Sequence, residues 1–128
     1  FERNPFDRVV SAWHYMKKNR EAKGTYRPDM TLAAYIENEN ALTRLRDRGW
    51  GLYTVNDAVI VDKVYRFEEL NDAMADIYDR LGIPDGEPLM QTKVSKREAG
   101  YRDYYDDTTR KAVETAFARE LDTFGYSF

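Results

Sequence analysis

The sequence contains no cysteine among its 128 residues. This absence excludes disulfide bonds, thiol catalysis and metal sites built on thiolates. It is also more typical of a reducing compartment than of the secretory pathway, so we expect a cytoplasmic location. No apolar run approaches the roughly 18 residues that a membrane-spanning helix requires, and no segment reads as a signal peptide, so no membrane partner is expected.

An excess of positive charge is also lacking. The chain carries 20 Lys and Arg against 23 Asp and Glu, and its net charge is −3 at pH 7. Nucleic-acid-binding domains usually have a basic surface, so we expect no nucleic-acid partner. Any anion site must be a local basic cluster on a mildly acidic protein. His14 is the only histidine; we expect it to be packed or partly exposed rather than catalytic, and we expect no metal site.

The residues present are enough for a single domain over residues 1–128. The hydrophobic fraction is 42% and the charged fraction 34%, which is typical of a soluble protein with a hydrophobic core. Ten tyrosines and two tryptophans are many for this length. Such rings occur on sugar-binding surfaces as well as in cores and interfaces, and we favour the core role.

The first eleven residues predict the end of a strand that continues directly into a helix. Asn4 is a good helix N-cap, because its side-chain oxygen can accept from free N–H groups of the first turn. Pro5 suits the first helical position, where its missing N–H costs nothing. An apolar stripe at helical spacing follows, made of Phe6, Val9, Val10 and Trp13. Arg3 is thereby placed at a strand–helix junction, a frequent anion site in α/β proteins.

Residues 3–13, RNPFDRVVSAW, resemble the 3′-phosphate-binding segment of sulfotransferases that use 3′-phosphoadenosine 5′-phosphosulfate (PAPS). In that family an Arg and a Ser eight positions later bind the 3′-phosphate. The resemblance therefore implies that Arg3 and Ser11 bind PAPS or its product PAP (3′-phosphoadenosine 5′-phosphate). From the residues alone, Arg3 could instead pair with a carboxylate, and Ser11 could be a small packing residue. Because Asp7 would repel a phosphate on the helix axis, we expect the phosphate beside the helix.

Two further parts of the chain resemble the same family, in the family's order. Residues 65–70, YRFEEL, are similar to its strand-to-helix element. Residues 101–107, a helix and residues 124–128 are similar to the closing part of the carbohydrate-sulfotransferase branch. We expect Glu68 to be a helix-start carboxylate that pairs with a basic group rather than a general base.

A long loop over residues 83–100 contains the densest basic cluster in the chain. Its members are Lys93, Ser95, Lys96 and Arg97. From the residues alone this cluster could be a solvated charge run or a phosphate-binding loop, and long loops in compact domains tend to be functional. The resemblance implies that it closes over the nucleotide phosphates. The Asn common in the carbohydrate branch is absent, and Lys93 stands in its place, so the register can differ by a residue or two.

The remaining elements are predicted from periodicity and from turn residues. Helices are expected over residues 5–20, 32–48, 68–81 and 107–123, with Gly49 ending the second and Asp106 capping the last. Residues 51–61 predict a pair of short strands, or a strand after a loop, with a turn at Asn56-Asp57. Residues 64–67 predict a strand buried in the main sheet. We expect Tyr126 and Phe128 to pack back on the core.

Together these features predict an α/β fold, with a small parallel sheet flanked by helices. The resemblance implies a partial P-loop-type sulfotransferase fold that lacks the N-terminal phosphosulfate-binding loop, because no G-x-x-x-x-G-K-[ST] motif occurs in the chain. The sequence opens inside a motif, so we expect a truncated chain, inactive alone.

The expected function is sulfuryl transfer from PAPS to a carbohydrate hydroxyl. The alternative is a degenerate, non-catalytic module that keeps the fold and serves binding or assembly. The catalytic base, the acceptor and the oligomeric state stay open.

Overall fold

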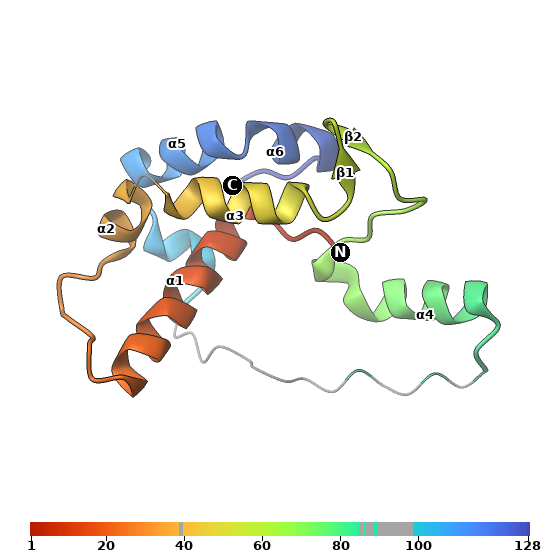
Figure 1. The fold of residues 1–128 in the computed structure, drawn as a ribbon, viewed down its shortest axis with the longest axis horizontal. Coiled ribbons are helices and arrows are strands. Elements are labelled where there is room, and N and C mark those ends of the chain that lie inside the picture. The colour runs from red at the N-terminus through yellow and green to blue at the C-terminus, as the bar shows by residue number, and fades with distance from the viewer. Residues whose placement is uncertain (39, 85, 87–88, 90–98) are drawn as a thin grey trace.

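The computed structural model describes residues 1–38, 40–84, 86, 89 and 99–128, and within them the chain is mostly helical (Figure 1). Every helix and strand follows in chain order: α1 (Pro5–Ala22), α2 (Leu32–Glu37), α3 (Ala41–Trp50), β1 (Thr54–Val55), β2 (Ala58–Val59), the 3-10 helix η1 (Phe67–Glu69), α4 (Leu70–Leu81), the 3-10 helix η2 (Tyr101–Tyr104), α5 (Asp107–Ala116) and α6 (Ala118–Phe124). No helix in these described ranges is long and apolar enough to cross a membrane.

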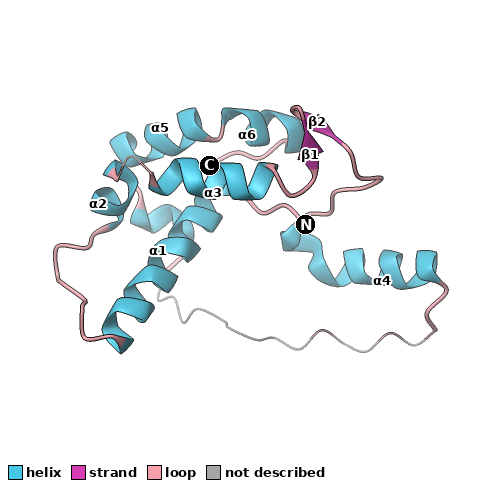
Figure 2. Cartoon of the chain, in the orientation of Figure 1, coloured by secondary structure: helices cyan, strands magenta, loops and turns pink. Residues whose placement is uncertain are grey.

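The predicted α/β fold with a small parallel sheet, and with it the partial P-loop-type fold, is wrong. In the part of the chain that the structure describes, the only sheet is the antiparallel hairpin β1–β2 (Figure 2). Residues 64–67 form no buried strand. Their parallel pairing is confined to one bridge between Glu2 and Arg66, and η1 begins at the next residue. A parallel sheet is normally covered on both faces, whereas Phe67 is 43% exposed here.

Helix α1 forms as its sequence predicts. The side chain of Asn4 accepts a hydrogen bond from the backbone N–H of Phe6, and Pro5 occupies the first helical turn. The apolar stripe is buried and forms the centre of the core, together with residues of α2, α3, α5 and the α5–α6 junction: Phe6, Val9, Val10, Trp13, Leu32, Ile36, Leu42, Val113 and Phe117. In Figure 1, α5 and α6 lie at the top with α3 next to them, α1 runs from α3 towards the lower left, and α4 stands apart.

Two predicted helices are each divided in the structure. The predicted helix over residues 32–48 is α2 and α3, and the predicted helix over residues 107–123 is α5 and α6. At the second break Phe117 has φ −114° and ψ 21°, outside helical values, and its side chain is fully buried. The break thus lets Phe117 enter the core from the junction between α5 and α6.

Several local predictions are confirmed. Asn56 and Asp57 both have positive φ and form the two-residue turn between β1 and β2, as the I′-type hairpin requires. Helix α4 ends at Gly82, and α6 ends at Gly125, each glycine in the left-handed conformation. Asp106 caps α5. Beyond α6 the chain turns back, and the half-buried ring of Phe128 packs against Phe6 with ring centroids 5.0 Å apart.

Candidate functional site

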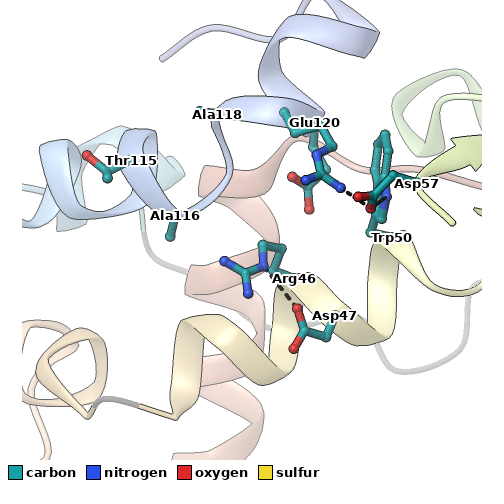
Figure 3. Close-up of a pocket in the computed structure, with 9 residues that line it drawn as sticks. Arg46, Asp47, Trp50, Asp57, Thr115, Ala116, Ala118 and Glu120 are labelled. Carbon is teal, nitrogen blue, oxygen red and sulfur yellow. Dashed lines mark hydrogen bonds and ion pairs between the residues drawn. The ribbon is translucent and has the colours of Figure 1, made fainter.

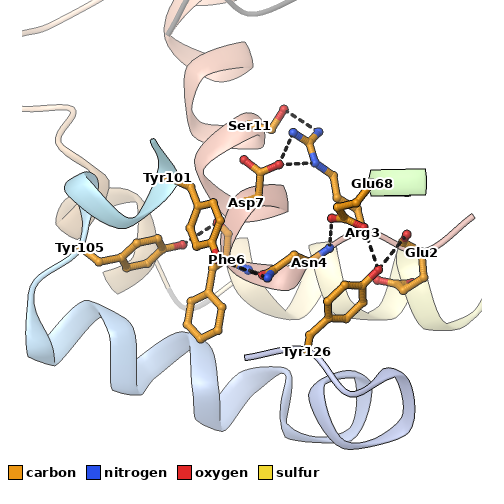
Figure 4. A network of polar contacts seen from close by, with 10 residues as sticks. All are labelled: Glu2, Arg3, Asn4, Phe6, Asp7, Ser11, Glu68, Tyr101, Tyr105 and Tyr126. Carbon is orange, nitrogen blue, oxygen red and sulfur yellow. Dashed lines mark hydrogen bonds and ion pairs between the residues drawn. The ribbon is translucent and has the colours of Figure 1, made fainter. Parts of the chain in front are cut away.

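The Arg3 side chain extends along the flank of α1, from the start of the helix towards Ser11 (Figure 4). Its Nη1 donates to the Oγ of Ser11 at 3.3 Å, and its Nε donates to the Oδ2 of Asp7 at 2.7 Å. Its Nη2 lies 2.5 Å from the same Asp7 oxygen. The guanidinium also lies over the ring of Phe67, 4.7 Å from its centroid. Arg3 and Ser11 are thus neighbours, and Asp7 lies between them along the helix.

The structure confirms the alternative in which Arg3 pairs with a carboxylate, whereas phosphate binding by Arg3 stays a prediction. Arg3 pairs with a carboxylate, Asp7, and it also meets Ser11. The side chains of Arg3 and Asp7 are 25% and 19% exposed, so the cluster is accessible to a ligand. Ser11 accepts from Arg3, which leaves its hydroxyl hydrogen available to donate. An anion beside the helix can contact both residues, while Asp7 neutralises part of the positive charge.

Glu68 joins the three sequence segments on which the family resemblance rests. Its Oε1 accepts from the backbone N–H of Asn4 at 2.8 Å, and its Oε2 accepts from the hydroxyl of Tyr126 at 2.9 Å (Figure 4). Burial and the Glu68 carboxylate raise the pKa of Tyr126 above its usual range. Glu68 begins the α4 region as expected, but its partners are a backbone amide and a phenol rather than a basic side chain.

The Asn4 side chain links the C-terminal tail to the start of α1 by a hydrogen bond. Its Nδ2 lies within hydrogen-bond distance of the backbone oxygen of Ser127 at 3.2 Å and of the hydroxyl of Tyr101 at 3.4 Å. Tyr105 donates to the backbone oxygen of Phe6 at 2.9 Å. The tyrosines of residues 101–105 are therefore part of the packing around α1, as the core interpretation predicts.

The other predicted site residues belong to the basic cluster of residues 93–97. Lys93, Ser95, Lys96 and Arg97 all lie outside the described residues. His14, which we expect to be packed or partly exposed rather than catalytic, is partly exposed and lies next to two aromatic rings. Its ring centroid is 4.7 Å from that of Trp13 and 5.3 Å from that of Tyr104.

The sequence did not predict a buried charged network, which consists of Glu2, Arg8, Tyr53 and Glu120. Arg8 Nη1 donates to Glu2 Oε1 at 2.6 Å, and the Tyr53 hydroxyl donates to Glu2 Oε2 at 2.8 Å. Arg8 Nη2 also lies 3.6 Å from Glu120 Oε1. Burial raises the pKa of Tyr53 and that of Glu120, the first further raised by its hydrogen bond to Glu2.

The prediction that Gly49 ends the second helix is wrong. Instead α3 continues through Gly49 to Trp50. A Cβ atom on Gly49 would lie 2.5 Å from Nη1 of Arg8, so the missing side chain makes room for the guanidinium. A glycine inside a predicted helix can thus mark the close approach of a side chain from another element.

A surface cleft of about 450 Å³ lies between α3 and the α5–α6 segment (Figure 3). Trp50 and Arg119 both donate to Asp57 on its wall, and Arg46 pairs with Asp47 at 3.0 Å. Its lining comprises Arg46, Asp47, Trp50, Asp57, Thr115, Ala116, Ala118, Arg119 and Glu120. Arg3 and Ser11, the predicted nucleotide-binding residues within the described ranges, are not among them.

No group of three or more His, Cys, Asp or Glu side chains is arranged to hold a metal ion within the described ranges. Comparisons of the chain with protein-family models, with curated proteins and with solved structures found no match.

Proposed function

We propose that the chain takes part in sulfuryl transfer from PAPS to a carbohydrate hydroxyl, with Arg3 and Ser11 holding the 3′-phosphate of the nucleotide. The observation that carries the proposal is the 3.3 Å contact between Arg3 Nη1 and Ser11 Oγ. The two residues come from positions that the sulfotransferase-like segment pairs, and their donors lie close enough to share one phosphate group. A cytoplasmic location is part of the proposal, supported by the absence of cysteine.

The reaction sets the requirements that the remaining residues must meet. The acceptor oxygen attacks the sulfur of PAPS, the bond between sulfur and the bridging phosphate oxygen breaks, and PAP leaves. A base takes the proton of the acceptor, and positive groups stabilise charge on the leaving phosphate. We assign Lys93, Ser95, Lys96 and Arg97 to the nucleotide phosphates, and we assign the base to no residue. Because the phosphosulfate-binding motif is not found in the sequence, we expect nucleotide binding without transfer by this chain alone.

The test compares PAP with AMP, which lacks the 3′-phosphate. Nuclear magnetic resonance titration suits it, because it detects the weak binding expected when the phosphosulfate contacts are missing. Charge-assisted hydrogen bonds are worth about 1.5–3 kcal/mol each, so PAP should bind at least about tenfold more tightly than AMP. Amide shifts should centre on residues 3–11, and Arg3→Ala should remove the preference for PAP.

Arg110→Ala provides the matched control. Arg110 is an exposed arginine that pairs with Glu114 four residues later, and its removal changes the net charge as Arg3→Ala does. The preference for PAP should survive in this variant. Equal binding of PAP and AMP by the unmodified chain, or an unchanged preference in Arg3→Ala, would overturn the proposed function.

A further inference from the structure

The contacts of Asp7 occupy one edge of the Arg3 guanidinium. Both Nε and Nη2 of Arg3 approach the same Asp7 oxygen, at 2.7 and 2.5 Å, and the contact from Nη1 to Ser11 is longer, at 3.3 Å. Asp7 is therefore the closest anchor of the guanidinium. A guanidinium carries five N–H groups, so these contacts leave one N–H on Nη1 and one on Nη2 for a ligand.

The orientation of Arg3 is also restrained from a second element. The ring of Phe67, the first residue of η1, covers one face of the guanidinium at 4.7 Å. Asp7 at the edge, Phe67 on the face and Ser11 at Nη1 hold the group in one plane. A long and flexible arginine side chain normally loses much rotamer freedom when it binds an anion, and restraint before binding removes that cost.

We propose that Asp7 is a positioning residue of the phosphate site, and that its orientation of Arg3 outweighs its repulsion of the bound phosphate. The inference rests on the proposed function, since it assumes that Arg3 binds a phosphate monoester. Asp7 acts in two opposite ways. Its negative charge weakens phosphate binding, whereas its contacts hold the guanidinium of Arg3 beside the helix, next to the hydroxyl of Ser11.

Salt screens the repulsion at the partly exposed site but leaves the direct contacts between Asp7 and Arg3 largely intact. Repulsion and orientation can therefore be separated by the sign of the change in PAP affinity when the Asp7 charge is removed. If repulsion dominated, every variant that removes the Asp7 charge would bind PAP more tightly. If orientation dominates, the outcome depends on whether the new side chain still offers Arg3 an acceptor oxygen.

The experiment measures PAP and AMP affinity at 150 mM salt for Asp7→Ala and Asp7→Asn. Asp7→Ala removes the charge and the acceptor, and should weaken PAP binding by about five- to tenfold with little change for AMP. Asp7→Asn removes the charge but keeps an acceptor, and should bind PAP within about threefold of the unmodified chain. Asp107→Ala is the control, because Asp107 lies in the first turn of α5 and is exposed. It should leave PAP binding unchanged.

The outcomes distinguish this inference from the function on which it rests. If the unmodified chain does not prefer PAP over AMP, both fail. If it does, and Asp7→Ala binds PAP as tightly or more tightly, the positioning role alone is overturned. Thermal unfolding of each variant checks that the fold is intact, and Asp7→Asn retests the role without loss of the acceptor. An equal loss in Asp7→Asn and Asp7→Ala would also overturn the inference, because it would show that orientation by an acceptor is not what matters.

Discussion

The guanidinium of Arg3 reaches the hydroxyl of Ser11 across two turns of α1, with Nη1 and Oγ 3.3 Å apart. Ser11 lies about 10 Å along the helix, at ~1.5 Å per residue, so Arg3 has to lie along the helix flank to meet it. A ligand that contacts both residues must therefore lie beside α1 rather than on its axis. The position of Asp7 between them agrees with this, because a carboxylate in the first turn disfavours an anion on the axis.

Tyr53→Phe should destabilise the protein by about 2 kcal/mol, because it removes the hydroxyl that donates to the buried carboxylate of Glu2. Urea unfolding followed by circular dichroism measures the change. Tyr15→Phe is the matched control, since Tyr15 is 63% exposed, and it should change the free energy of unfolding by less than about 0.5 kcal/mol. Equal effects of the two variants would show that the hydrogen bond to Glu2 does not stabilise the fold.

Glu120 should make the folded state less stable as the pH rises. Burial raises the pKa of its carboxyl above the ordinary value of 4.5, although the charge of Arg8 opposes the shift. Between the unfolded and the folded pKa the native state binds more protons than the unfolded state. The free energy of unfolding therefore falls with rising pH in this window, by at most about 1.4 kcal/mol per pH unit.

Glu120→Gln should remove this contribution to the pH dependence. The melting temperature of the variant minus that of the unmodified chain should increase between pH 4.5 and pH 7.5. Glu114→Gln, which removes a partly exposed carboxylate from α5, should not show this trend. A difference for Glu120→Gln that stays constant with pH would contradict the assignment.

Asn4→Ala should destabilise the protein by about 1–2 kcal/mol, because it removes the side-chain cap of α1 and the contacts to the C-terminal tail. Asn4→Ser keeps a capping oxygen but loses the amide donor. It should therefore recover a large part of the stability lost in Asn4→Ala, as measured by thermal unfolding. If the two variants are equally destabilised, the contacts to Ser127 and Tyr101 matter more than the cap.

The sequence was most informative where a local signal decides the local structure. The Asn4-Pro5 start of α1, the Asn56-Asp57 turn and the Gly82 helix end each depend on backbone preferences of one or two residues. The apolar stripe of α1 likewise predicts its buried face, because helical spacing places those residues on one side.

The parallel sheet failed because strand pairing is not a local property. Residues 64–67 have the composition of a strand, but among the described residues their strand-type pairing is one bridge, between Arg66 and Glu2. The N–H of Glu2 donates to Tyr65 at 2.8 Å, and the N–H of Phe67 donates to Glu2 at 2.7 Å. Strand propensity depends on such neighbours and on burial, so composition alone could not decide between a strand and an extended segment.

The contact between Arg3 and Ser11 agrees with the sequence-based hypothesis, whereas the buried charged network was not predicted. Arg3 and Ser11 were proposed because their segment resembles one in which an Arg and a Ser eight positions later bind a phosphate, and the structure places the two side chains in contact. Arg8 lies about 200° around α1 from Phe6, at ~100° per residue, so helical spacing assigns it to solvent. Its partners Glu2 and Glu120 lie at opposite ends of the chain, and only the fold brings them together.

A double-mutant cycle tests most directly whether Arg3 and Ser11 bind one phosphate group together. PAP and AMP affinities would be measured for the unmodified chain, Arg3→Ala, Ser11→Ala and the double variant. Each single variant should lose at least about fivefold in PAP affinity with AMP unchanged, and the double variant should lose less than the product of the two losses. Independent losses that multiply, or equal losses for PAP and AMP, would contradict a shared 3′-phosphate site.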